Sequence, residues 1–82
     1  MQYWIHIFDD TSTIKLRSFE SSYSVLDEAV SNLIADINRE AVSTADGVYI
    51  VVLTAFQNFK FPANADDFIV KVNKSGAKYT II

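Results

Sequence analysis

Residues 24–42 have the spacing of an amphipathic helix. Apolar residues recur in this stretch every three or four positions, at Leu26, Ala29, Val30, Leu33, Ile34, Ile37 and Ala41. That spacing places side chains on one face of a helix. Ser24 is expected to be the N-cap, with Asp27 and Glu28 in the first turn, where the helix dipole favours acids. The opposite face is predicted to be solvated, because it mixes both signs of charge at Asp36, Arg39 and Glu40.

The other apolar runs are short and many of them alternate with polar residues, which is typical of strands. We expect strands near residues 3–8, 13–19, 48–53, 59–61, 68–72 and 77–82. Turn-forming residues separate them, and Gly76 is free to adopt positive φ in the last hairpin. The run Val48–Leu53 has no charge and would promote aggregation at a sheet edge. It is therefore placed in the centre of the sheet, beside the first strand.

The order of these elements predicts an α+β fold in a single domain, residues 1–82. Two strands, one helix and then two or three strands give the order ββαββ(β), with four or five strands in a single antiparallel sheet and one α-helix packed on one face. A chain of 82 residues is long enough for one hydrophobic core only.

A comparison of sizes suggests where this fold would bind another molecule. A helix is about 10–12 Å across, whereas four or five strands span about 15–20 Å, and no second element is predicted for the other face. The side chains assigned to that face are apolar or aromatic, namely Trp4, Phe8, Tyr49 and Val51. An exposed patch of this kind usually marks an interface. We expect it to bind a protein partner or a second copy of the chain in a homodimer.

Composition and charge exclude several classes of function. There is no cysteine, which rules out disulfides, zinc–thiolate sites and thiol catalysis. No signal peptide is visible, and the longest apolar run is far shorter than the ~20 residues of a membrane span. A cytoplasmic protein with no membrane contact is therefore expected. The net charge of −3, from ten acids and seven bases, is too small for an acidic mimic of DNA.

Few residues suggest catalysis or metal binding. His6 is the only histidine, and its two isoleucine neighbours favour a structural role over acid–base catalysis, which needs a positioned partner. The acid pairs Asp9–Asp10 and Asp66–Asp67 could hold a hard cation together, but solvated turn residues are the preferred interpretation. No glycine-rich loop or nucleophile elbow is present. We expect no enzyme activity, no metal and no cofactor. The alternative is a small enzyme subunit completed by oligomerisation, with His6 near the interface.

A second function remains open because basic residues gather on the predicted strands. Four of them could bind a polyanion, at Lys15, Arg17, Lys71 and Lys78. Trp4 and Tyr79 could supply a platform on which bases stack. The structural alternative is that strand lysines prevent edge-to-edge pairing.

Binding to a protein is the function that this sequence favours. The helix start Leu26–Val30 resembles the segment that opens the helix in small HicB-like antitoxins, which also begin with strands. The strand and loop signature expected before that segment is absent, so the resemblance implies no function. Size and acidity match many small proteins of phages and plasmids. We expect a stand-alone inhibitor or antitoxin-like protein, of the anti-defence type, that occludes a protein target.

Overall fold

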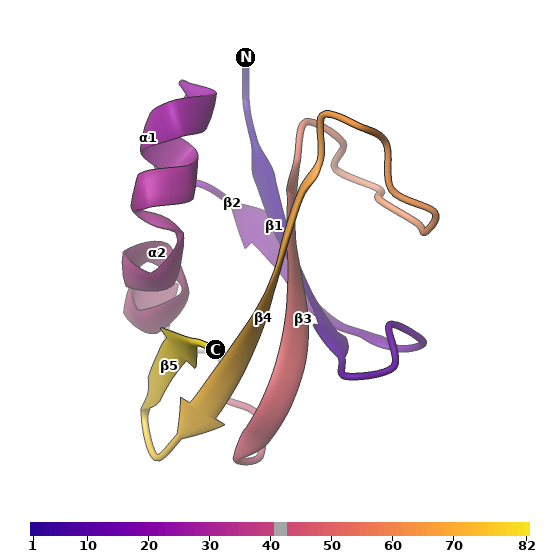
Figure 1. Ribbon diagram of the computed structural model, residues 1–82. Coiled ribbons are helices and arrows are strands. Elements are labelled where there is room, and N and C mark those ends of the chain that lie inside the picture. The colour runs from indigo at the N-terminus through magenta and orange to yellow at the C-terminus, as the bar shows by residue number, and fades with distance from the viewer. Residues whose placement is uncertain (41–42) are drawn as a thin grey trace.

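The chain folds into one antiparallel sheet with helices on one side. The computed structural model describes residues 1–40 and 43–82. Its elements are β1 (Trp4–Asp9), β2 (Lys15–Glu20), α1 (Leu26–Ser31), α2 (Leu33–Glu40), β3 (Gly47–Thr54), β4 (Phe68–Ser75) and β5 (Lys78–Ile81). The strands are ordered β2-β1-β3-β4-β5, and both helices lie on the same side of them (Figure 1). This confirms the predicted α+β fold.

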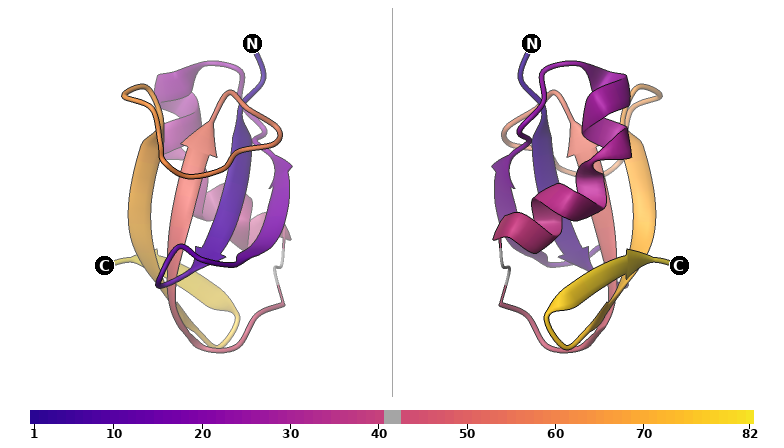
Figure 2. Two further views of the ribbon diagram at one scale, coloured as in Figure 1. Left: turned by 90° about the vertical axis from the view of Figure 1, so that its right-hand side faces the viewer. Right: turned by 90° about the vertical axis from the view of Figure 1, so that its left-hand side faces the viewer.

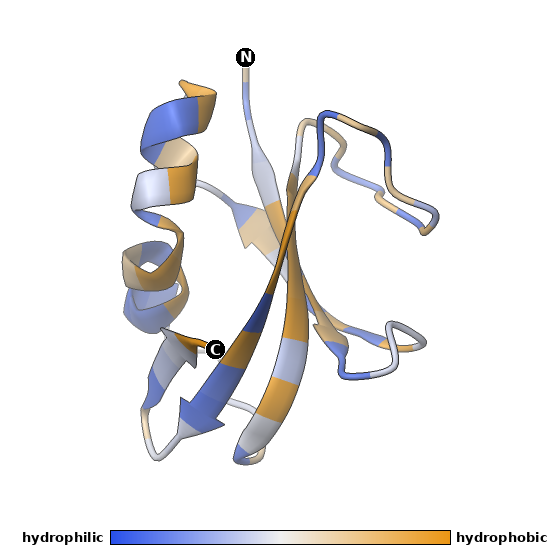
Figure 3. Cartoon of the chain, viewed as in Figure 1, coloured by the Kyte–Doolittle hydropathy of each residue, from blue (hydrophilic) through white to orange (hydrophobic). Residues whose placement is uncertain are grey.

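The central strand is β3, as its sequence predicts. It pairs with β1 on one side and with β4 on the other, and its last four residues are all buried. Apolar residues recur along β3 and β4 in Figure 3. The uncharged run therefore lies where both its backbone edges are paired, which protects it from aggregation.

The predicted helix is divided into two at Asn32. The Asn32 side chain donates to the carbonyl of Glu28 at 2.8 Å, and such local bonding by asparagine competes with helix continuation. The buried face nevertheless continues through Ala29, Leu33 and Ile37. The cap prediction is wrong, because Val25 rather than Ser24 occupies the N-cap position and no side chain bonds there. The predicted end of the helix, at 41–42, lies outside the described residues.

Asp36 is buried, and its predicted place on the solvated face is wrong. It is 1% exposed because the segment between β2 and α1 passes over it. One carboxylate oxygen accepts from the Ser21 hydroxyl and from the Ser22 backbone N–H, each at 3.2 Å. The other lies 2.8 Å from Arg39 Nη1. The charge is thus compensated where it is buried, as such groups require.

The helix side of the sheet holds the main hydrophobic core. Its buried residues are Ile5, Ile7, Phe19, Ala29, Leu33, Ile37, Tyr49, Val51, Leu53, Val72 and Tyr79. The assignment of Tyr49 and Val51 to the opposite face is wrong. Val51 pairs with Ile7 and Tyr49 with Asp9, and paired residues point to the same side of a sheet.

The other face is covered by residues 55–67, the long connection between β3 and β4. Figure 2 shows this segment crossing in front of β3 and β1. Phe59 packs with Phe8 and Val52, and Phe61 adds to the cluster. The expected strand at 59–61 is wrong, since these residues have no strand structure. The expectation that no other part of the chain covers this face is also wrong, because the aromatic side chains of the connection do so.

The β4–β5 hairpin curls towards α2 (Figure 1). The Tyr79 N–H donates to Asn38 Oδ1 on α2 at 2.9 Å, and the buried Tyr79 ring meets Tyr49 edge-on. Burial raises the pKa of the Tyr79 phenol, against the opposing effect of its hydrogen bond to Thr44. Gly76 turns the hairpin with φ of +63°, as its position predicted. The C-terminal strand thus joins sheet and helix at one end.

Candidate functional site

His6 links three separate parts of the chain. Its Nε2 donates to the backbone carbonyl of Phe56 at 2.9 Å, so in the neutral ring Nδ1 accepts from the Ser18 hydroxyl at 2.6 Å. The ring stacks on Phe59, with 5.8 Å between ring centres. His6 is fully buried. It therefore holds the 55–67 connection onto β1 and β2.

The environment of His6 favours its neutral form. Burial lowers the pKa of His6 below 6.5, the Phe56 carbonyl acts in the opposite direction, and the charges of Lys15 and Asp67 have smaller, opposed effects on it. A buried imidazole with both nitrogens engaged is consistent with the structural role predicted from sequence.

The Ser18–His6 pair has the spacing of a nucleophile and its base. The group that orients the histidine is a backbone carbonyl, however, in place of the carboxylate of a triad. Neither Ser18 nor His6 lines any of the three hollows considered below. The geometry gives this pair a role in positioning the connection.

The two acid pairs lie at opposite ends of the sheet. Asp9 ends β1 beside the first hairpin, where its carboxylate accepts from Thr11 and from two backbone N–H groups. The hydrogen bond from Thr11 is the main reason why the pKa of Asp9 is lowered. Asp66 and Asp67 precede β4, next to the start of β1. The pairs therefore do not meet, and the described residues contain no cluster of three metal-ligand side chains.

The four residues predicted as an interface do not form one patch. Trp4 is half-buried at the start of β1, and Phe8 is 5% exposed beneath the 55–67 connection. Tyr49 and Val51 belong to the helix-side core. They can reach a partner only if that core opens.

The four predicted polyanion residues are divided between the faces. Lys15 and Lys71 pair with Phe8 and Ile50, which places them on the face that carries the 55–67 connection. Lys78 shares that face at the β5 edge. Arg17 pairs with Ile7 on the helix side and meets Glu40 at 3.1 Å. Tyr79 is buried and cannot stack on a base.

One end of the molecule carries two adjoining hollows, which we call the end groove. They hold about 370 and about 450 Å³ and share Leu26, Asp66 and Asp67. The first is also lined by Met1, Tyr3, Ala55, Phe56 and Asn64. The second is also lined by Asp27, Val30, Ser31, Ala65 and Phe68. The groove thus runs between α1 and the end of the 55–67 connection.

The end groove combines apolar walls with negative charge. Asp27, Asp66 and Asp67 line it, and its described lining includes no lysine or arginine. Asp67 is held in place, since it accepts from the Thr54 hydroxyl at 2.6 Å and from the Asn64 N–H at 2.8 Å. Phe56 remains 56% exposed at the groove. Such a surface is complementary to a segment that is both apolar and basic.

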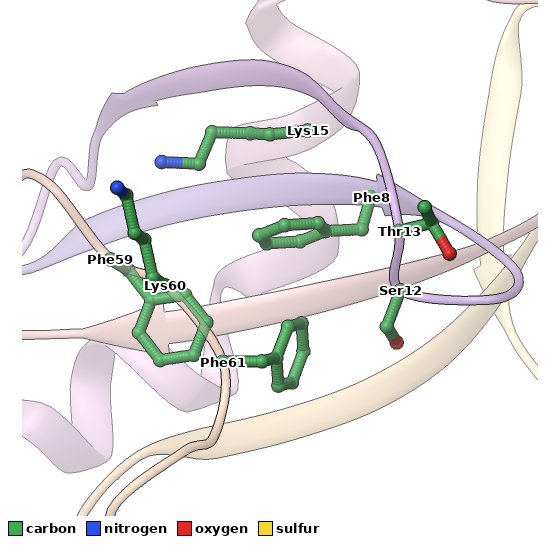
Figure 4. A pocket seen from close by; sticks show the side chains of 7 residues that line it. All are labelled: Phe8, Ser12, Thr13, Lys15, Phe59, Lys60 and Phe61. Atoms are coloured by element: carbon green, nitrogen blue, oxygen red, sulfur yellow. The ribbon is translucent and has the colours of Figure 1, made fainter.

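A third hollow, of about 380 Å³, lies on the covered face and is called the aromatic hollow. It is lined by Phe8, Ser12, Thr13, Lys15, Phe59, Lys60 and Phe61 (Figure 4). The three rings pack edge to face, with Phe61 4.9 Å from Phe8 and 5.0 Å from Phe59. Lys15 and Lys60 line the aromatic hollow and no acid among the described residues does, so its charge is opposite to that of the end groove.

Sequence reasoning missed most of both sites. Phe56 and Asp66 are far from Leu26 in the sequence, so only the folded chain brings them together. Phe59 and Phe61 were noticed but interpreted as a strand, because alternation alone does not distinguish a strand from a loop with two buried anchors.

Comparison with known proteins does not extend this description. The chain matches no family model, no curated protein and no solved structure. The resemblance to HicB-like antitoxins stays confined to Leu26–Val30. Among the described residues, neither helix is long and apolar enough to cross a membrane.

Proposed function

We propose that the protein is a non-enzymatic binding module that holds a basic, apolar segment of a partner protein in its end groove. The observation that supports this most is the exposure of Phe56, at 56%, in a hollow that Asp66 and Asp67 also line. Exposed large apolar side chains next to a hollow are typical of an interaction site. The proposal therefore assigns the interface to the end of the sheet, whereas the sequence predicted it on the sheet face.

The charge of the groove determines which partner fits. A lysine- or arginine-rich segment would place its cations against Asp27 and Asp66, which are both solvent-exposed. Its apolar side chains would cover Phe56 and Leu26. Aromatic anchors dominate the energy of most interfaces, whereas rim charges mainly speed association and select the partner. Phe56 is therefore the expected anchor.

Occlusion is the mode of action that follows from this site. While the groove holds a basic segment of the partner, that segment cannot bind the partner's own acidic ligands. A partner that needs this segment for its activity would therefore be inhibited. This agrees with the inhibitor or antitoxin-like role expected from sequence. Two end grooves repel each other by charge, so a homodimer would have to form elsewhere.

The test uses a labelled peptide of Lys and Leu at helical spacing as the probe, followed by fluorescence anisotropy. We expect saturable binding that weakens as salt rises, and none by the matching peptide of Glu and Leu. Phe56→Ala should weaken binding by roughly tenfold or more, the loss typical of an aromatic anchor. Asp66→Asn should weaken it less and reduce its salt dependence.

The matched control is Ile81→Ala, since Ile81 is as exposed as Phe56, at 56%, but lies on β5. It should leave binding unchanged. Equal binding of the two peptides, or an equal loss in Phe56→Ala and Ile81→Ala, would contradict the proposal. Sedimentation at several concentrations separates peptide binding from self-association.

A further inference from the structure

We propose that the aromatic hollow is a second binding site, independent of the end groove, and that its ligand is a nucleoside phosphate. The ligand would be either a free mononucleotide or a unit of a single strand. Its phosphate would lie between Lys15 and Lys60 and its base against Phe61.

Two lysines from distant parts of the sequence flank this hollow. Lys15 lies on β2, with its Nζ 5.9 Å from the centre of the Phe8 ring, and Lys60 comes from the 55–67 connection. In Figure 4 both side chains extend towards the same end of the ring cluster. Both lysines are exposed, so their charges are available to a ligand.

No acid lines the hollow among the described residues. Asp9 stands nearby in sequence, at the end of β1, but the first hairpin engages its carboxylate. That carboxylate accepts from the Thr11 hydroxyl at 2.6 Å and from the Thr13 and Ile14 N–H groups at 2.7 and 2.9 Å. The positive charge at the hollow is therefore concentrated in a chain whose net charge is −3.

Protection of a sheet edge does not account for these lysines. Lys15 lies on the edge strand β2, where that explanation applies. Lys60 lies outside any strand, and Lys71, on the same face, belongs to β4, which is paired on both sides.

The floor of the hollow suits the rest of a nucleotide. Phe8 and Phe59 are 5% and 3% exposed and form an apolar base, while Phe61 is only partly buried and can contact a ring. Ring edges carry partial positive charge, and the Ser12 hydroxyl at the rim can donate to a phosphate or sugar oxygen. The volume of about 380 Å³ lies within the range of small-molecule sites.

The experiment titrates the full chain, at low salt, with a labelled oligothymidylate of about eight nucleotides, with adenosine monophosphate and with inorganic phosphate. Chemical shifts of the backbone amides report the site. We expect perturbations at residues 12–15 and 59–61, and weakening with salt. Response to the mononucleotide supports a free nucleotide as ligand, whereas response to the oligonucleotide alone supports a strand.

The variants are Lys60→Gln, which should weaken binding about fivefold or more, and Phe61→Leu, which removes a stacking contact of similar size but retains apolar cover. Lys78→Gln is the matched control, since it removes the same charge from the β5 edge. Equal losses for Lys60→Gln and Lys78→Gln, no response to any nucleotide, or inorganic phosphate binding as well as the nucleotides would overturn the proposal. Binding of the basic peptide to the end groove should be unaffected throughout, so the two proposals fail separately.

Discussion

The two faces of the sheet are covered in different ways. On the helix side, eleven of the described residues form a continuous buried core. On the other side three buried residues form the cluster, and polar links from His6 and Thr54 hold the 55–67 connection in place. The helix side is thus stabilised by buried area, and the connection by a few specific contacts. Single substitutions and pH should therefore affect the two faces unequally.

The largest expected effect is on the helix side. Leu33 is 1% exposed between α2 and the sheet, so Leu33→Ala should lower the free energy of unfolding by about 2–5 kcal/mol through lost burial and a cavity. Urea unfolding followed by circular dichroism measures it. A loss below about 1 kcal/mol would mean that the helices add little to the fold.

Phe59→Ala should have a smaller global effect, although phenylalanine is the larger residue. Loss of the Phe59 ring should open the 55–67 connection locally. Because this segment can open without the rest of the fold, the free energy of global unfolding should change less. We expect amide exchange to rise in residues 55–67 and to stay slow in β3. An equal increase in amide exchange in residues 55–67 and in β3 would show that the two faces unfold together.

Thr54→Val tests one polar link. Thr54 is 1% exposed, and its hydroxyl donates to the charged Asp67, so the substitution should destabilise the protein by about 1.5–3 kcal/mol. The matched control is Thr80→Val on β5, where Thr80 is exposed and a change within about 0.5 kcal/mol is expected. Urea unfolding of both variants measures the change in the free energy of unfolding. An equal decrease in the two variants would contradict the prediction.

Acidification should weaken the connection through His6. Because burial lowers the pKa of His6 in the folded protein, the unfolded chain binds the proton more readily. The stabilisation is complete above pH 6.5 and is lost as pH falls below 6.5 towards the lower folded pKa. The slope is at most about 1.4 kcal/mol per pH unit.

The measurement is amide exchange in residues 55–67 at about pH 7 and about pH 5.5, corrected for the intrinsic rate. The control is His6→Gln, which cannot titrate and should abolish the pH-dependent difference. A difference of the same size in that variant would assign the effect to other groups.

The sequence predicted the regular part of the molecule well. The spacing of Ala29, Leu33 and Ile37 identified the helical face, and the uncharged run 48–53 identified the central strand. The sequence could not predict which residues of β3 point towards the helices. Ile50 and Val52 are as apolar as Val51, so the alternation of apolar and polar residues does not distinguish the two faces.

The candidate sites were harder to predict than the fold. Asp36 has the local pattern of a solvated residue, and only the path of residues 21–22 buries it. The end groove and the aromatic hollow depend on segments that meet after folding. Of the residues predicted as interface or polyanion sites, Phe8 and Lys15 line the aromatic hollow, and the others line neither site.

The end groove has a consequence for a chain that is still being made. Its walls come from residues 1–3, from α1 and from residues 55–68, so a growing chain that ends before residue 68 has only part of them. The position of Phe68 in the groove depends on the pairing of β4 with β3, in which Phe68 lies opposite Leu53. A partner that recognises the groove would therefore distinguish chains that extend past residue 68 from shorter ones, and products truncated before residue 68 would not compete for it.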